Sequence, residues 1–171
     1  MDNFCEYLIK KKPTGMEMLL KVGIVILAIL LSVVVFCVCL LVKFLGTFSL
    51  FGAICVFYGA YVLLMHMSIE YEYIFTNGEL DIDMIRGKKT RKRLVTIRCK
   101  DIKVMEKTDV FIKKDDGGKK VLDVRYNASL GGVYKIDATS KKGNDVLVYF
   151  QPPERLVEEM KKYNPSKIIA E

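Results

Sequence analysis

Charge is almost missing from a long stretch near the N-terminus of this 171-residue chain. Residues 22–67 contain a single Lys or Arg, Lys43, and neither Asp nor Glu. Two apolar runs, residues 22–42 and 44–67, are each long enough to cross a bilayer core of about 30 Å as a helix. A signal peptide has an apolar core of only about 7–15 residues and no second run. We therefore predict a hairpin of two transmembrane helices over residues 22–67.

Asp, Glu, Lys and Arg are also missing from the centres of both runs. Such groups inside a membrane usually mark the path of an ion or proton, so their absence argues against a transporter or pump. Small side chains of the kind that let two helices approach closely lie along the second run. They are Ser49, Gly52, Ala53, Gly59 and Ala60. They predict packing either within the hairpin, against Gly23, Ala28 and Ser32, or between copies in a homo-oligomer.

Histidine is missing after residue 68, because the one histidine of the chain is His66. That part therefore has no Ser–His or Cys–His nucleophile pair and no histidine metal ligand. No CxxC pair exists either, so a zinc site or disulfide framework is not indicated. Asp81 and Asp83 share a face of one predicted strand, where balancing nearby positive charge is the simpler interpretation. We expect no enzyme activity, no cofactor and no metal ion.

The distribution of Lys and Arg around the two runs predicts the orientation in the membrane. The basic residues before the first run are Lys10, Lys11, Lys12 and Lys21. They place both termini in the cytoplasm and the short turn outside, in a multi-pass protein of the cell membrane. Residues 1–21 are then a cytoplasmic N-terminal segment, either a short interfacial helix or an unstructured tail.

Residues 68–171 have the pattern of a cytoplasmic β domain. Residues 69–75 and 79–85 alternate between apolar and polar side chains, and Asn77-Gly78 between them is a strong signal for a tight hairpin turn. Further strands are predicted at residues 92–97, 102–105, 110–113, 121–127, 133–139 and 145–150. A helix follows at residues 153–163, with proline in its first turn and Asn164-Pro165 after its end. The domain is thus predicted to have about seven antiparallel strands, give or take one, and one C-terminal helix.

This order of elements resembles a pleckstrin-homology-like (PH-like) barrel. The stretch Arg93-Leu94-Val95-Thr96-Ile97, followed by Lys100-Asp101-Ile102-Lys103-Val104, is similar to the bacterial PH-like signature. The whole chain, including the Pro-Pro-Glu-Arg-Leu start of the last helix and the Lys-Tyr-Asn-Pro that follows, resembles an uncharacterised family of small two-span bacterial membrane proteins with a C-terminal PH-like domain. The resemblance implies an α+β membrane protein, with a transmembrane hairpin followed by a helix-capped antiparallel β-barrel. It implies no activity, and a different small β-barrel is the alternative fold.

The most prominent charged feature is the sequence RGKKTRKR at residues 86–93. Its six basic residues are Arg86, Lys88, Lys89, Arg91, Lys92 and Arg93. Contact with anionic lipid headgroups or with a protein partner is one interpretation, since basic residues near a bilayer are attracted by about 1 kcal/mol each. The others are that the loop only sets topology or solvates a hairpin tip, or that it balances Glu70, Glu72, Asp81 and Asp83. Nucleic acid is disfavoured, because no aromatic residue lies among the basic ones for base stacking.

Together these patterns predict a non-enzymatic, membrane-anchored binding or scaffold module at the cytoplasmic leaflet. Its partners are then the lipid bilayer and either anionic headgroups or a membrane protein. The alternative is an accessory subunit of a larger membrane complex, assembled through the transmembrane hairpin.

Overall fold

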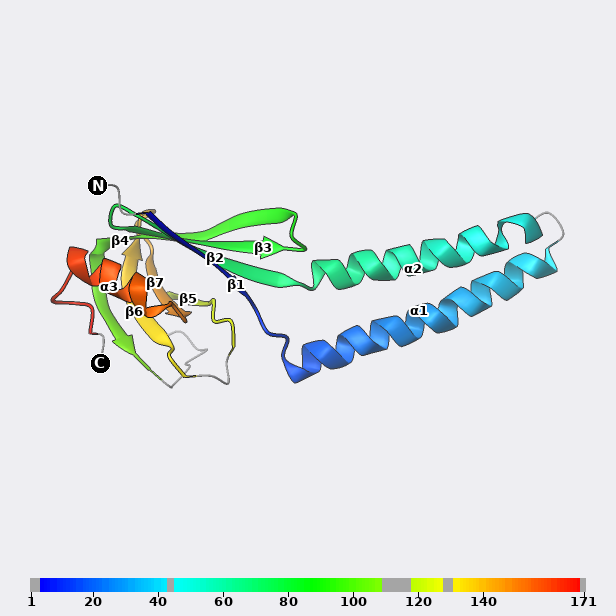
Figure 1. The fold of residues 1–171 in the computed structure, drawn as a ribbon, viewed down its shortest axis with the longest axis horizontal. Coiled ribbons are helices and arrows are strands. Elements are labelled where there is room, and N and C mark those ends of the chain that lie inside the picture. The colour runs from blue at the N-terminus through cyan, green and yellow to red at the C-terminus, as the bar shows by residue number, and fades with distance from the viewer. Residues whose placement is uncertain (1–3, 43–44, 109–117, 128–130, 170–171) are drawn as a thin grey trace. The chain divides into compact units, whose positions relative to one another are not determined.

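The computed structural model describes residues 4–42, 45–108, 118–127 and 131–169 (Figure 1). The chain forms two compact units. The helical unit comprises residues 13–68, and the sheet unit comprises residues 1–12 together with 69–171. Lys43 and the strand predicted at residues 110–113 lie outside the described residues.

The helical unit contains α1 (Gly15–Leu41), a 3-10 turn η1 (Gly46–Phe48) and α2 (Ser49–His66). The first helix begins at Gly15 rather than at residue 22. Its N-cap is Thr14, whose N–H donates to the Glu17 carboxylate at 3.0 Å. This hydrogen bond is part of a capping box, which favours the start of a helix at this position. Both helical segments, Gly15–Leu41 and Gly46–His66, are long and apolar enough to cross a membrane.

Small residues mediate the packing of α1 against α2. Ala28, Ser32 and Ser49 are buried, and a Cβ atom added to Gly52 would lie 3.0 Å from Cγ1 of Val35. The predicted packing within the hairpin is therefore present at these positions. Gly23 and Gly59, in contrast, are exposed and do not contribute to it.

The N-terminal segment is a strand, so the prediction of an interfacial helix or an unstructured tail was wrong. Strand β1 (Phe4–Lys10) pairs antiparallel with β2 (Ile69–Thr76) over seven residue pairs, from Phe4 with Thr76 to Lys10 with Glu70. Cys5, Tyr7 and Ile9 lie against the hydrophobic core while the residues between them are exposed. This pairing makes residues 1–12 part of the sheet unit rather than a separate segment.

Within the described residues, the sheet has seven strands in the order β1-β2-β3-β4-β6-β7-β5. The remaining strands are β3 (Glu79–Arg86), β4 (Thr90–Lys107), β5 (Lys120–Asp123), β6 (Tyr134–Ser140) and β7 (Asp145–Phe150). Asn77 and Gly78 have φ of +48° and +84°, so the predicted tight turn between β2 and β3 is confirmed.

The sheet is open, so the predicted closed barrel was wrong. Among the strands that the structure describes, β1 and β5 are at the edges. Strand β5 pairs with β7 in parallel, whereas the other described strand pairs are antiparallel. The strands predicted at residues 92–97 and 102–105 form one long strand, β4. Its first half pairs with β3 and its second half with β6, with register shifts between Ile97 and Val104 that let the strand bend.

Helix α3 (Glu154–Tyr163) covers the core as predicted for residues 153–163. Leu156, Val157 and Met160 are its buried residues. The Tyr163 ring packs edge to face against Phe75, with 5.6 Å between the ring centroids. Figure 1 shows α3 beside the bent part of β4. The chain after α3 is held to β4 by hydrogen bonds from Met105 to the Lys167 carbonyl (2.8 Å) and from Ile169 to the Met105 carbonyl (2.9 Å).

Candidate functional site

The six basic residues predicted as a contact site lie on the hairpin formed by β3 and β4. The turn between these strands is residues 87–89, where Gly87 and Lys88 have φ of +60° and +58° and the Lys89 N–H donates to the Arg86 carbonyl at 3.3 Å. All six basic side chains are exposed. The segment joins two paired strands as predicted, but only Lys88 and Lys89 lie in the turn itself, and the other four are strand residues. The ion pairs divide the six residues into two groups.

Arg91 and Arg93 form the first group, and both make ion pairs with acidic residues of the sheet. Arg91 donates from Nε to Asp83 at 2.7 Å and from Nη2 to Glu72. Arg93 donates from Nε to Asp83 at 2.8 Å and is paired through Nη1 with Asp81, also at 2.8 Å. These five residues occupy neighbouring positions on one face, because Glu72 pairs with Asp83 and Asp83 with Arg93 across the strands.

The acidic members of this network are more buried than the basic ones. The Asp83 and Glu72 side chains are 3% and 7% exposed, whereas each arginine side chain is about half exposed. Hydrogen bonding to Asp83 raises the pKa of the Arg93 guanidinium above its ordinary value, and Asp81 adds to the effect. The arginines thus serve as counter-charge for Glu72, Asp81 and Asp83. Glu70, also expected to be balanced by the loop, is buried but has no ion pair among the described residues.

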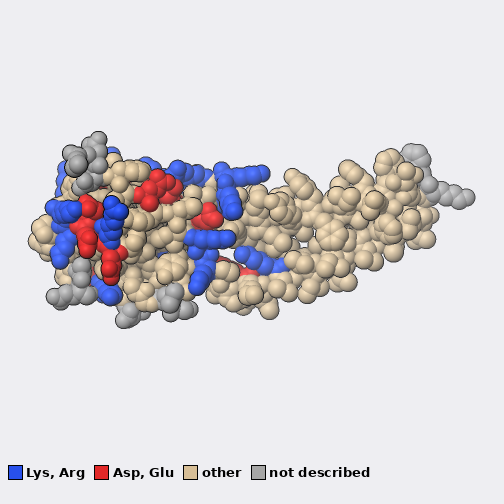
Figure 2. Space-filling model, viewed as in Figure 1, with Lys and Arg blue, Asp and Glu red and all other residues tan. Residues whose placement is uncertain are grey.

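Arg86, Lys88, Lys89 and Lys92 form the second group. In the part of the chain that the structure describes, none of these four makes an ion pair. Their charges therefore remain available at the surface. Figure 2 shows that Lys and Arg gather on the sheet unit, whereas the visible surface of the helical unit is almost entirely uncharged.

The register of the sheet brings further lysines to the same end as this second group. Arg86 is opposite Ile69 on β2, and Lys10 of β1 is opposite the next residue, Glu70. Lys10 and Lys12 are exposed and have no ion pair among the described residues. We call the resulting surface the basic end of the sheet. It consists of Lys10, Lys12, Arg86, Lys88, Lys89 and Lys92.

Sequence analysis missed the basic end as a single surface, because the two lysines and the hairpin are more than 70 residues apart in the chain. The signal that could have found it is the alternation of Cys5, Tyr7 and Ile9 with exposed residues, which is typical of a strand. Such a strand at the N-terminus has to pair with an edge of the sheet.

The remaining acidic and sulfur-containing groups do not gather into a metal site within the described residues. No group of three or more His, Cys, Asp or Glu side chains there could hold a metal ion. Asp81 and Asp83, the two carboxylates considered as a pair, are each bound by arginine. Burial raises the pKa of the Cys99 thiol to about 12, so this side chain stays a neutral part of the core.

Comparison with known proteins gives a match to one family model. It is described as a bacterial PH-like domain (DUF6106) and it matches residues 1–170. Searches of curated proteins and of solved structures give no match to this chain. The matched residues include β1, both apolar helices, the open sheet and α3. Since the model covers nearly the whole chain, this protein belongs to the bacterial PH-like domain family DUF6106, whose function is unknown.

Proposed function

We propose that this protein is a non-enzymatic binding module, anchored in the cell membrane by α1 and α2, whose basic end contacts anionic lipid headgroups at the cytoplasmic leaflet. The observation that carries the proposal is the position of the basic end in the chain. Only residues 11–14 separate β1 from α1, and only Met67 and Ser68 separate α2 from β2. At no more than about 3.6 Å per residue, both links are short.

Strand β1 ends, and strand β2 begins, at the basic end of the sheet. Lys10 is the last residue of β1, and Ile69, the first residue of β2, is opposite Arg86. If α1 and α2 span a bilayer, the links tether the basic end close to its surface. Basic residues there are attracted to anionic lipid by about 1 kcal/mol each, and the attraction falls off within a Debye length of about 8 Å at physiological salt.

Pairing of β1 with β2 also supports the proposed orientation. Because these strands flank the two helices in sequence and lie in one sheet, the termini of the chain belong to the same side of a membrane that both helices cross. The excess of lysine before α1 favours the cytoplasm for that side.

A tryptophan placed at the hairpin tip tests the lipid contact. The chain has no Trp, so Thr90→Trp, at an exposed position, provides a single fluorescent reporter. The full chain is placed in nanodiscs of phosphatidylcholine with or without phosphatidylglycerol, each containing a lipid with a nitroxide-labelled headgroup. We expect stronger quenching with phosphatidylglycerol at low salt, and loss of the difference at about 1 M salt, where the Debye length is about 3 Å. Equal quenching in the two nanodiscs at low salt would refute the proposal.

Two charge variants make this test specific. Replacing Arg86, Lys89 and Lys92 with Gln and Lys88 with Asn removes four charges of the basic end, and Asn suits the positive φ of residue 88. The control replaces four exposed lysines without described ion pairs, Lys100, Lys107, Lys161 and Lys167, with Gln. The first variant should lose the effect of phosphatidylglycerol, and the control should keep it. The whole chain is required, because residues 68–171 alone lack β1.

An apolar groove on the helical unit favours the alternative role as an accessory subunit. It encloses about 320 Å³ between α1 and α2, with Leu27, Ala28 and Leu31 on one side and Val56, Gly59 and Ala60 on the other. A helix of another membrane protein could occupy it, since helices in lipid associate at small residues. This role predicts a stable partner that co-purifies in mild detergent and is lost with Gly59→Leu. Isolation of this chain alone would contradict it.

A further inference from the structure

A pocket on the sheet unit, away from the turn of the β3–β4 hairpin, is lined by a different set of basic residues. The pocket has a volume of about 370 Å³ and lies where β4, β5 and the β6–β7 turn meet. It exists because β6 ends at Ser140, which is opposite Ile97, so that β6 does not continue along Leu94, Val95 and Thr96. Beside the pocket, the β6–β7 turn is joined to β4 by a hydrogen bond from the Lys141 N–H to the Thr96 carbonyl at 2.9 Å.

The lining of the pocket combines apolar residues with positive charge. Leu94, Val95 and Val146 provide apolar surface. The charged residues are Arg93, Lys120, Lys141 and Lys142, and no Asp or Glu is among the lining residues. Small-molecule sites typically have volumes of about 300–1,000 Å³ and combine apolar walls with a few polar groups, so both the size and the lining fit such a site.

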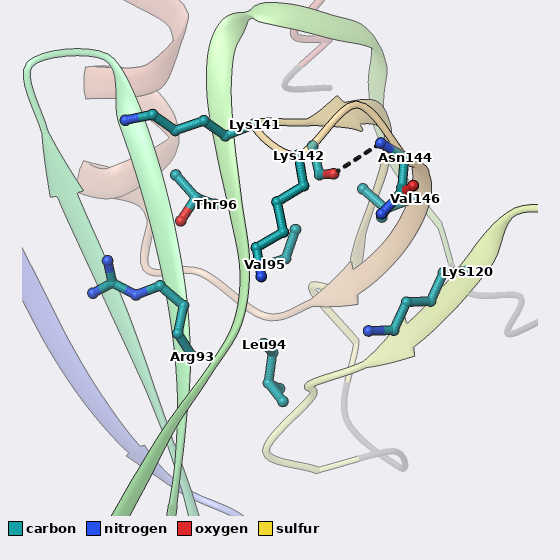
Figure 3. A pocket seen from close by; sticks show the side chains of 10 residues that line it. Arg93, Leu94, Val95, Thr96, Lys120, Lys141, Lys142, Asn144 and Val146 are labelled. Carbon is teal, nitrogen blue, oxygen red and sulfur yellow. Dashed lines mark hydrogen bonds between the residues drawn. The ribbon is translucent and has the colours of Figure 1, made fainter.

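Two of these four cations are already neutralised. Lys141 is paired with Glu79 at 3.0 Å, and Arg93 belongs to the network around Asp83. Lys120 and Lys142 have no ion pair among the described residues. Figure 3 shows these two side chains extending toward the space beside Leu94 and Val95, whereas Arg93 and Lys141 extend away from it.

Polar groups beside the two lysines could complete an anion site. The Ser140 Oγ accepts a hydrogen bond from the Asn144 N–H at 3.2 Å, which leaves the hydroxyl proton of Ser140 to be donated (Figure 3). The side-chain amide of Asn144 also lines the pocket and provides two N–H donors. Two ammonium groups, a hydroxyl and an amide match the charge and the acceptor oxygens of a phosphate monoester.

From this arrangement we infer that the pocket binds a small organic phosphate, with the phosphate between Lys120 and Lys142 and the organic part against Leu94 and Val146. The site is separate from the basic end and does not depend on the function proposed above. The phosphate belongs either to a soluble metabolite or to a lipid headgroup, because both present the same chemical group.

The test measures binding of two probes to the full chain. Glycerol 1-phosphate, added to the protein in detergent and followed by calorimetry, represents a soluble phosphate monoester. Phosphatidic acid, retained on the protein in native mass spectrometry, represents the lipid source. The double variant Lys120→Gln/Lys142→Gln should weaken binding of at least one probe by about a hundredfold, since each charge-assisted contact is worth about tenfold or more.

Matched variants identify the site and guard against a folding defect. Lys107→Gln/Lys167→Gln removes the same charge from exposed positions outside the pocket and should leave binding unchanged. Protection of the buried Cys99 thiol from alkylation verifies that each variant is folded. Loss confined to glycerol 1-phosphate assigns the site to soluble phosphates, and loss confined to phosphatidic acid assigns it to lipid. The inference is overturned if folded wild-type protein binds neither probe, or if the pocket variant and the control bind equally.

Discussion

Replacing Asp83 with Asn perturbs the network that holds Arg91 and Arg93 on the sheet. The Asp83 carboxylate accepts hydrogen bonds from Arg91 Nε at 2.7 Å, Arg93 Nε at 2.8 Å and Arg93 Nη2 at 3.4 Å. Asparagine has nearly the same shape but lacks the charge, and its NH₂ group would face the guanidinium groups. The substitution thus tests electrostatics with little change in packing.

The expected loss of stability follows from the burial of the partners. Breaking a fully buried ion pair costs about 3–5 kcal/mol. The Asp83 side chain is 3% exposed, but the arginine side chains are about half exposed and water can hydrate them after the change. We therefore expect a loss of about 2 kcal/mol. With a dependence on urea of about 2 kcal/mol per molar, the unfolding midpoint should fall by about 1 M.

Alkylation of Cys99 provides an assay that reports on the sheet unit alone. The side chain is 1% exposed in the core of the sheet, and burial also raises its pKa, so it reacts only after the sheet unfolds. The full chain in detergent is pulsed with iodoacetamide across a urea series, and the peptide containing Cys99 is quantified by mass spectrometry. The helical unit then does not contribute to the signal.

Two control variants show which results would refute the electrostatic reasoning. Asp145→Asn removes an exposed carboxylate that is paired with Lys103, so it should shift the midpoint far less. Lys88→Asn, at the unpaired hairpin tip, should change stability by no more than about 0.5 kcal/mol. The reasoning fails if Asp83→Asn leaves the midpoint of Cys99 labelling unchanged or shifts it no more than Asp145→Asn does.

Three further predictions concern the sheet unit. Gly78→Ala should lower stability by about 1–3 kcal/mol in the same assay, because residue 78 has φ of +84° and the new Cβ would lie 2.7 Å from Cδ1 of Tyr163; an unchanged urea midpoint would contradict this. Deletion of residues 2–12 should expose the edge of β2 and speed Cys99 alkylation without denaturant, whereas equal rates would show that β1 is dispensable. Burial raises the pKa of Cys99 from its ordinary 9.0 to about 12, so above pH 9 the unfolded chain loses this proton while the folded protein keeps it. Stability should therefore fall as the pH rises above 9. The fall, followed by circular dichroism, should be smaller in Cys99→Ala.

The amino-acid sequence by itself determined the local elements of this protein. Two uncharged runs are enough to predict the two long helices, because each is apolar over about 20 residues without a Pro or a charge to interrupt it. Alternation around Asn77-Gly78 fixed the β2–β3 hairpin, since both turn residues must adopt positive φ. The stripe of Leu156, Val157 and Met160 likewise fixed α3. These features depend on contacts within a few residues of one another.

Only the tertiary structure decided how distant segments combine. Residues 4–10 are a strand because β2, about sixty residues later, offers an edge, and local pattern cannot name that partner. The sheet stays open because β5 pairs with β7 and not with β1. Pairing of β2, β3 and β4 places Arg91 and Arg93 against the buried Glu72 and Asp83, whereas Lys88 and Lys89 in the turn make no ion pair among the described residues. Charge count is therefore a property of the sequence, whereas the charge left available for a ligand depends on which strands lie side by side.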